Sequence, residues 1–165
     1  MPVINFKYSD LCTMLGEKVP QETLVRRIPM IGADMHETEG ETDEMSVEFF
    51  PDRPDLYSVE GLARGLRAFL DIEPGMKKYE VGESNVEVFV DSSVKSVRPW
   101  FLCGVVRDVD IDDDFLKSLM ELQEKLHITI GRKRSKLAIG IHDLSKVESP
   151  FTYRLAEPHS IRFVP

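Results

Sequence analysis

A cluster of four cations at 131–136 is the strongest candidate for chemistry in this sequence. The run GRKRSK places Arg132, Lys133, Arg134 and Lys136 between an expected helix and an expected strand. Guanidinium and ammonium groups at this spacing bind phosphate oxygens by charge and fork geometry, but they read no base sequence. The run has one glycine and lacks the G-x-x-x-x-G-K-[ST] spacing of a nucleotide-binding loop. It therefore indicates either a contact with a nucleic-acid backbone or a solvated turn.

Other residue types that perform catalysis are present without the spacing that catalysis needs. His142 and Asp143 are adjacent, but no second ligand lies at metal-binding spacing, so Asp143 is interpreted as the cap of the turn DLSKV. The run DVDIDDD lacks the glycine and the terminal glutamate of a calcium loop. No nucleophile elbow or Cys–His signature surrounds the serines and cysteines. We expect no metal site and no complete catalytic group here.

The negative net charge of the whole chain argues against a nucleic-acid partner, but this charge is unevenly distributed along the sequence. The 165 residues carry a formal net charge of −8. Residues 1–75 hold 7 basic and 15 acidic side chains, whereas residues 76–165 hold 14 of each. Phosphate repels an acidic segment, so any nucleic-acid contact is expected from local basic clusters in the second half.

The length and hydrophobic content suit one medium domain or two small ones with a real core. Hydrophobic residues make up 42% of the chain. No run approaches the roughly 20 apolar residues of a membrane span, and the N-terminus lacks a basic-then-apolar signal region. We therefore expect a cytoplasmic protein without membrane contact. Cys12 and Cys103 have no CxxC spacing and are expected as reduced thiols.

Helix-capping residues and prolines divide the first half into helices, a loop and a strand. Ser9 is expected to cap a short helix that Gly16 ends. Pro20 is expected to begin a second helix that Pro29 ends. Residues 32–44 are acidic and nearly free of apolar side chains, which predicts an exposed loop. The next run, MSVEFF, alternates as a strand does.

A stiff corner precedes the best helix of the first half. The two prolines of the run FFPDRPD (49–55) fix φ and favour extended backbone before them. Apolar positions at helical spacing predict a helix over 58–70, capped by Asp55 or Ser58. The corner is expected either as a strand-to-helix turn closed by an Arg53 salt bridge or as a surface for another domain or RNA.

Two glycines lie inside this expected helix. Gly61 and Gly65 each cost a helix about 1 kcal/mol relative to alanine. Either a neighbouring backbone approaches them closely, or they are tolerated on an exposed face.

The sequence changes character after EPG at 73–75, so we place a domain boundary at 71–76. Runs typical of strands follow: KKYEV, NVEVFVD, PWFLCGVV, ITI, LAIGI, FTYRLA and SIRFVP. The run DIDDDFLKSLMELQEKL predicts a helix with acids at the positive end of its dipole. The expected organisation is a helical unit over 1–75 and a β-rich, incomplete unit over 76–165.

Two long motifs occur in order along the chain: FFPDRPDLYSVEGLARGLRAFL, and RPWFLCGVVRDV followed by the run from LMELQEKL to YRLAEP. The first is similar to the signature NRPD-x-x-S-x-x-G-x-A-R, and the second to the start of the editing domain, of the β subunit of phenylalanyl-tRNA synthetase in its archaeal and eukaryotic form. The matching signature residues are Asp52 (where asparagine is commoner), Arg53, Pro54, Asp55, Ser58, Gly61 and Arg64. The residues that match the editing-domain opening are Arg132, Arg134, Gly140, His142, Asp143, Pro150, Phe151 and Tyr153.

The resemblance implies an α+β fold: a small helical, winged-helix-like domain over 1–75, then the β-rich opening part of the editing domain over 76–165. It implies a subunit of phenylalanine–tRNA ligase, an enzyme that uses ATP and Mg²⁺ and hydrolyses misacylated Tyr-tRNA. The implied partners are the α subunit, in an (αβ)₂ tetramer, and tRNAPhe. No catalytic residue or cofactor is expected in this segment, and its expected tRNA-backbone contacts are Arg132, Lys133, Arg134 and Lys136. The alternative is a free-standing protein- or RNA-binding module without catalysis.

Overall fold

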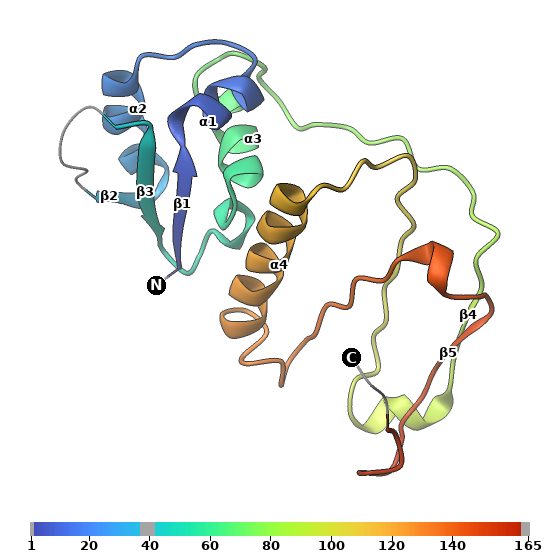
Figure 1. The fold of residues 1–165 in the computed structure, drawn as a ribbon. Coiled ribbons are helices and arrows are strands. Elements are labelled where there is room, and N and C mark those ends of the chain that lie inside the picture. The colour runs from blue at the N-terminus through green and yellow to red at the C-terminus, as the bar shows by residue number, and fades with distance from the viewer. Residues whose placement is uncertain (1, 37–41, 163–165) are drawn as a thin grey trace.

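The computed structural model describes residues 2–36 and 42–162 and has the predicted α+β architecture (Figure 1). The first part comprises β1 (Val3–Lys7), α1 (Tyr8–Leu15), α2 (Gln21–Arg27), β2 (Ala33–His36), β3 (Glu44–Phe49) and α3 (Val59–Phe69). The second part comprises β4 (Val88–Val90), α4 (Asp113–Ile128) and β5 (Phe151–Tyr153). Short 3₁₀ turns lie at Ile28–Ile31, Pro54–Leu56, Ser92–Ser96 and Leu144–Lys146.

The central strand β3 organises the core of the first part. It lies between β1 and β2 and is antiparallel to both, with Val47 opposite Ile4 and Met35. Alternate β3 side chains face inward because successive side chains of a strand point to opposite faces. Met45, Val47 and Phe49 are accordingly buried. They join buried side chains of the three helices: Leu11, Leu15, Leu24, Leu62, Ala63 and Leu66.

Most predicted helix boundaries of the first part are close to the observed ones, but two caps differ. Gly16 ends α1 in the left-handed region at φ +83°, as predicted. Ser9 does not cap α1, because the helix begins at Tyr8 with Lys7 as its N-cap and Ser9 lies in its first turn. The Ser9 backbone N–H and hydroxyl instead donate to the Asp43 carboxylate, at 3.0 and 2.7 Å. Pro20 precedes α2 as its N-cap, and Pro29 lies inside the 3₁₀ turn after it.

The prediction of an exposed loop over 32–44 is wrong at both of its ends. Ala33–His36 forms β2, an edge strand whose backbone pairs with β3, and Glu44 begins β3. Acidic side chains can occupy an edge strand because one of its faces is open to water. Residues 37–41 lie outside the described part of the chain. The strand β1 was not predicted at all.

The second part contains less strand than its sequence pattern indicated. The helix expected over 110–126 is confirmed as α4, which begins three residues later because Asp112 caps it by accepting from the Phe115 N–H at 2.7 Å. Of the expected strands, only three residues of NVEVFVD and three of FTYRLA pair, in parallel. The runs KKYEV, PWFLCGVV, ITI and LAIGI form none, and neither do residues 160–162; the last three residues of SIRFVP lie outside the described range. A strand requires a neighbour for its backbone hydrogen bonds, and an alternating pattern does not supply that neighbour.

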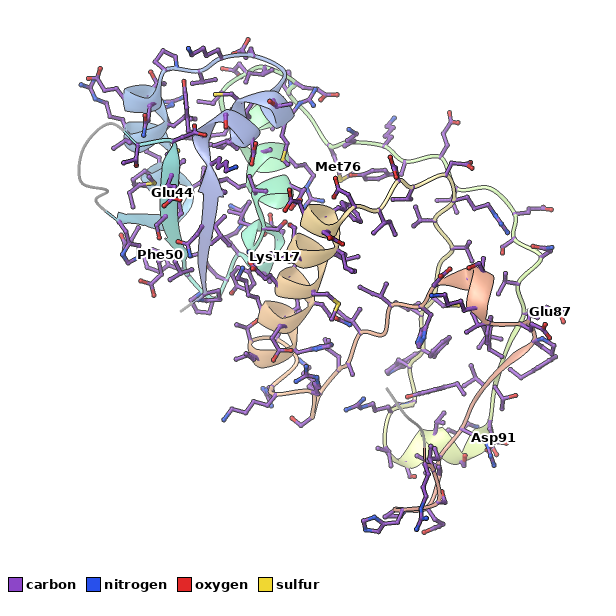
Figure 2. All side chains as sticks on the ribbon, in the orientation of Figure 1. Glu44, Phe50, Met76, Glu87, Asp91 and Lys117 are labelled. Carbon is purple, nitrogen blue, oxygen red and sulfur yellow. The ribbon has the colours of Figure 1, made fainter. Side chains whose placement is uncertain are left out.

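Helix α4 returns from the second part to pack beside α3 (Figure 1). Leu122 and Leu126 pack against the core of the first part, and the Ser118 hydroxyl donates to Glu60 at 3.0 Å. Away from α4 the chain follows an extended path, along which Figure 2 labels Met76, Glu87 and Asp91. The boundary predicted at 71–76 stays a prediction.

Two further expectations concern membranes and thiols. None of the helices within the described residues is long and apolar enough to cross a bilayer. Cys12 and Cys103 are free, as predicted, with Cys12 half-buried and Cys103 exposed.

Candidate nucleic-acid interface

The signature corner is closed by the ion pair that its sequence indicated. The Arg53 guanidinium donates from Nε and Nη2 to the two carboxylate oxygens of Asp55, each at 2.9 Å, and its Nη1 reaches the Ile31 carbonyl at 3.5 Å. Ser58, rather than Asp55, caps α3, since its hydroxyl oxygen accepts from the Gly61 N–H at 3.2 Å. The hydrogen bonds from Arg53 hold the pKa of the Asp55 carboxyl below its ordinary value of 3.8.

The signature residues gather around an open groove of about 690 Å³ between α3, α4 and residues 73–79. Five of the seven line it: Pro54, Asp55, Ser58, Gly61 and Arg64. Leu122 and Leu126 of α4 form part of the opposite wall. Asp52 and Arg53 lie outside the lining. In the sequence these residues belong to a corner and to the helix after it. The tertiary structure brings five of the seven together in one groove.

The basic turn follows α4 directly, and hydrogen bonds tie it to the end of that helix. The Gly131 N–H donates to the Leu126 carbonyl at 2.9 Å, and the Arg134 N–H donates to the His127 carbonyl at 3.2 Å. These bonds satisfy carbonyls that the last turn of a helix leaves without partners. A Cβ at position 131 would lie 2.7 Å from the His127 carbonyl oxygen, so this approach requires glycine.

Three consecutive residues of the turn have left-handed backbone. The φ angles of Arg132, Lys133 and Arg134 are +49°, +54° and +66°. Residues other than glycine adopt this region uncommonly because the Cβ crowds the following carbonyl. The turn therefore depends on the contacts that hold it against α4.

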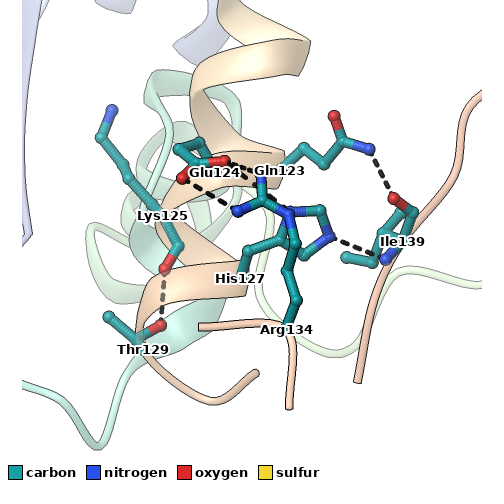
Figure 3. Close-up of polar contacts among 7 residues, drawn as sticks. All are labelled: Gln123, Glu124, Lys125, His127, Thr129, Arg134 and Ile139. Atoms are coloured by element: carbon teal, nitrogen blue, oxygen red, sulfur yellow. Dashed lines mark hydrogen bonds and ion pairs between the residues drawn. The ribbon is translucent and has the colours of Figure 1, made fainter. Parts of the chain in front are cut away.

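Arg134 supplies two of those contacts, of which Figure 3 draws the one with Glu124. Its guanidinium forms an ion pair with Glu124 of α4, and its backbone carbonyl accepts from the guanidinium of Arg98. The first contact connects the turn to the helix, and the second connects it to the segment after the 3₁₀ turn Ser92–Ser96. Arg134 is thus engaged with the protein at both its side chain and its backbone.

Two α4 side chains fix the strand-like segment that follows the turn (Figure 3). The Ile139 N–H donates to Nε2 of His127 at 2.7 Å, and the Ile139 carbonyl accepts from Nε2 of Gln123 at 2.6 Å. His127 and Gln123 are four residues apart, so their side chains lie on one face of the helix. His127 is buried, and its Nδ1 lies 3.8 Å from a Glu124 carboxylate oxygen, beyond hydrogen-bond distance.

The four predicted RNA-binding cations are all exposed but not equivalent. Arg132, Lys133 and Lys136 have no carboxylate partner among residues 2–36 and 42–162, whereas Arg134 has Glu124. Lys125, near the end of α4, is occupied by Glu121 at 3.4 Å. The turn therefore presents three uncompensated cations at one end of α4.

His142 and Asp143, which the resemblance assigns to the editing-domain opening, form a capped turn. Asp143 accepts from the Ser145 hydroxyl at 2.7 Å and from its N–H at 3.0 Å, as interpreted from the sequence. These bonds lower the pKa of the Asp143 carboxyl. Within the described residues no three His, Cys, Asp or Glu side chains are grouped so that they could hold a metal ion.

Similarity to known proteins extends over the whole chain, although no protein-family model matches it. All 165 residues align with the phenylalanine–tRNA ligase β subunits of Methanothrix thermoacetophila, at 52% identity, and Methanosphaera stadtmanae, at 46%. The chain is a homologue of the archaeal phenylalanine–tRNA ligase β subunit. It spans 30% and 29% of the length of those two relatives. The resemblance drawn from the two sequence motifs is thereby confirmed.

A solved structure indicates which region of the β subunit is similar. The crystal structure of an N-terminal fragment of the phenylalanyl-tRNA synthetase β subunit from Pyrococcus horikoshii matches with a TM-score of 0.81 at 36% identity. The match covers 94% of this chain and 46% of that fragment. The α+β fold described above is therefore that of an N-terminal β-subunit region.

Sequence reasoning missed the residues that hold the basic turn in this β-subunit homologue. Arg98, Gln123, Glu124 and His127 lie within the runs that resemble the editing-domain opening, but none of them was singled out there, and each acts through a partner 10 to 36 positions away. Gln123 lay in the predicted helix, which ended at Leu126, and His127 followed it directly, so only their i, i+4 spacing was visible. That spacing is common on helices and would not have identified them.

Proposed function

We propose that this chain serves as the N-terminal part of a phenylalanine–tRNA ligase β subunit. The observation that carries the proposal is identity of 46% to 52% over the full chain with two archaeal β subunits. In this proposal residues 1–75 form a scaffold domain and residues 76–165 form the opening part of the editing domain. The complete enzyme would attach phenylalanine to tRNAPhe and hydrolyse misacylated Tyr-tRNA.

The partners in this proposal are a catalytic α subunit, in an (αβ)₂ tetramer, and tRNAPhe, in the cytoplasm. The complete enzyme would consume ATP with Mg²⁺. The residues that the structure describes do not fit such a site, because they contain neither a grouped set of metal ligands nor a glycine-rich phosphate loop. We therefore derive no step of ATP chemistry from this segment and assign it positioning and binding roles.

The test is reconstitution of the enzyme from the complete β subunit containing this segment. It would be co-expressed with the α subunit of the same organism, and the purified complex would be assayed for charging of tRNAPhe and for deacylation of Tyr-tRNAPhe. The complex is expected to perform both reactions. The 165-residue chain alone is expected to catalyse neither deacylation nor ATP–pyrophosphate exchange.

Two outcomes would contradict the proposal. A β chain that does not co-purify with the α subunit, in a preparation that charges no tRNAPhe, would favour the free-standing binding module instead. Deacylation of Tyr-tRNAPhe by the 165-residue chain would place an editing site inside this segment, where none is assigned.

A further inference from the structure

We infer that Arg132, Lys133 and Lys136 bind the phosphate backbone of the tRNA, and that Arg134 is a positioning residue that holds them. This inference rests on the function proposed above, which supplies the RNA. It divides the basic turn into two roles, whereas its sequence suggested four equivalent contacts. The two roles are distinguished by ion pairing, because Arg134 is paired with Glu124 and the other three cations have no carboxylate partner within the described residues.

The three binding cations are free to meet a polyanion. They are exposed and lack carboxylate partners among the described residues, so no ion pair has to break before they reach phosphate. Each phosphate contact releases condensed counterions, which favours association at low salt. The chain from 76 to 165 is neutral overall, so this local excess of positive charge is not offset as it would be in the acidic first part.

The backbone of the turn indicates an extended anion rather than a single small one. A site for free phosphate usually collects several backbone N–H groups in a concave loop. Here the N–H groups of Gly131, Arg132 and Arg134 donate to carbonyls of residues 126–129, and those of Ser135 and Lys136 donate within the turn. Recognition must therefore come from the side chains, which suit the spaced phosphates of a nucleic-acid backbone.

Arg134 has the contacts expected of a positioning residue. Its guanidinium is held by Glu124, and its carbonyl is held by Arg98. Its side chain is 53% exposed, so the pair is reached by water and adds little affinity of its own. Its effect is geometric, because the left-handed residues beside it need a fixed anchor on α4.

The experiment uses the complete α–β complex and fluorescently labelled tRNAPhe, with binding measured by anisotropy between 50 and 300 mM KCl. Replacing Arg132, Lys133 and Lys136 together by alanine should weaken binding and reduce the slope of log Kd against log salt by about 2, since each phosphate contact contributes about 0.7 to 0.9. The matched control replaces Lys78, Lys95 and Lys117, which are also exposed, by alanine. It changes the net charge equally and should leave the slope within about 0.5 of wild type.

A second pair of variants tests the positioning role. Arg134→Ala and Glu124→Gln should each speed hydrogen exchange at the backbone amides of 131–136 and leave the slope within about 0.5 of wild type. The triple variant should leave exchange at these amides unchanged. The division of roles would be overturned if Arg134→Ala reduced the salt slope by about 0.7 to 0.9, the amount expected for one phosphate contact, without speeding hydrogen exchange at these amides.

The remaining outcomes separate this inference from the proposed function. If the wild-type complex charges no tRNAPhe, the proposed function is wrong. If it charges tRNAPhe but the triple variant keeps the wild-type slope, or the control loses as much slope, the phosphate contact is refuted. Loss of α-subunit binding in the triple variant would show that the turn meets protein, which also refutes it.

Discussion

The Asp55 carbonyl oxygen lies so close to the backbone of Gly61 that a Cβ on that glycine would be 2.1 Å from it. No real Cβ tolerates such a distance, so the corner and the first turn of α3 can meet only at a glycine. Of the two explanations that the sequence left open for Gly61, close approach is therefore confirmed. At Gly65 the nearest atom to an added Cβ is Cδ2 of Leu56, the movable end of a side chain, at 3.0 Å.

Gly61→Ala should destabilise the chain, and Gly65→Ala should not. The first substitution forces backbone apart and should cost about 1–3 kcal/mol even though alanine favours helix. The second requires only a small shift of Leu56, which the helix propensity of alanine, worth about 1 kcal/mol, offsets. Urea unfolding of both variants measures the difference. Equal stability of the two would mean that the Asp55 contact does not constrain position 61.

Ser58→Ala should lower stability by about 1 kcal/mol, because the Gly61 N–H loses the oxygen that accepts from it at 3.2 Å. Ser58→Thr keeps the hydroxyl and serves as the control, with a smaller loss expected. Thermal melting of wild type and both variants gives the comparison. A threonine variant as unstable as the alanine variant would indicate that packing around buried Ser58, rather than capping, determines its effect.

The Arg53–Asp55 pair should make stability depend on pH in the acid range. Hydrogen bonds from Arg53 lower the pKa of Asp55 in the folded chain. The pair therefore contributes its full stability above the ordinary carboxyl pKa of 3.8, and loses it as the pH falls through the lower folded value. Asp55→Asn should be less stable than wild type at neutral pH, and the gap should close on acidification. A gap that persists at the lowest pH would assign the effect to packing.

His127→Ala should cost more stability than Gln123→Ala. The imidazole is buried and accepts from the Ile139 N–H at 2.7 Å, so its loss leaves both a cavity and an unpaired donor, at about 1–3 kcal/mol for the donor alone. Gln123 donates to the Ile139 carbonyl at an exposed position, where water can replace it. Chemical denaturation compares the two variants. Similar losses would show that the clamp on Ile139 is not held mainly by His127.

The charge of the basic turn could be predicted from its sequence, but the roles of its cations could not. Four cations in six residues are visible in any reading of 131–136. Which of them is paired depends on Glu124, ten positions before Arg134, and on Arg98, thirty-six positions before it. No local pattern encodes such pairings. They arise only when α4, the turn and the segment after Ser92–Ser96 are packed together.

By itself, the sequence determined the features that depend on neighbours along the chain. These are the α+β class, the strand at β3, the helices α3 and α4, the left-handed end of α1 at Gly16, the Arg53 ion pair as one of two alternatives, and the two family motifs. The strand, the helices, the helix end and the ion pair rest on side-chain periodicity, capping or backbone restriction within a few residues, where local physical chemistry is sufficient. The α+β class comes from the family resemblance that the two motifs carry.

Only the tertiary structure decided which segments become strands and where the motif residues meet. The acidic edge strand β2 forms because β3 offers it hydrogen bonds, whereas LAIGI, a better strand by pattern, has α4 side chains rather than a strand beside Ile139. The signature residues share a groove because α4 returns to α3 after more than forty residues of intervening chain. Whether a segment becomes a strand depends on hydrogen bonds and packing with distant segments as well as on local preference. A sequence pattern does not reveal which segments will be neighbours.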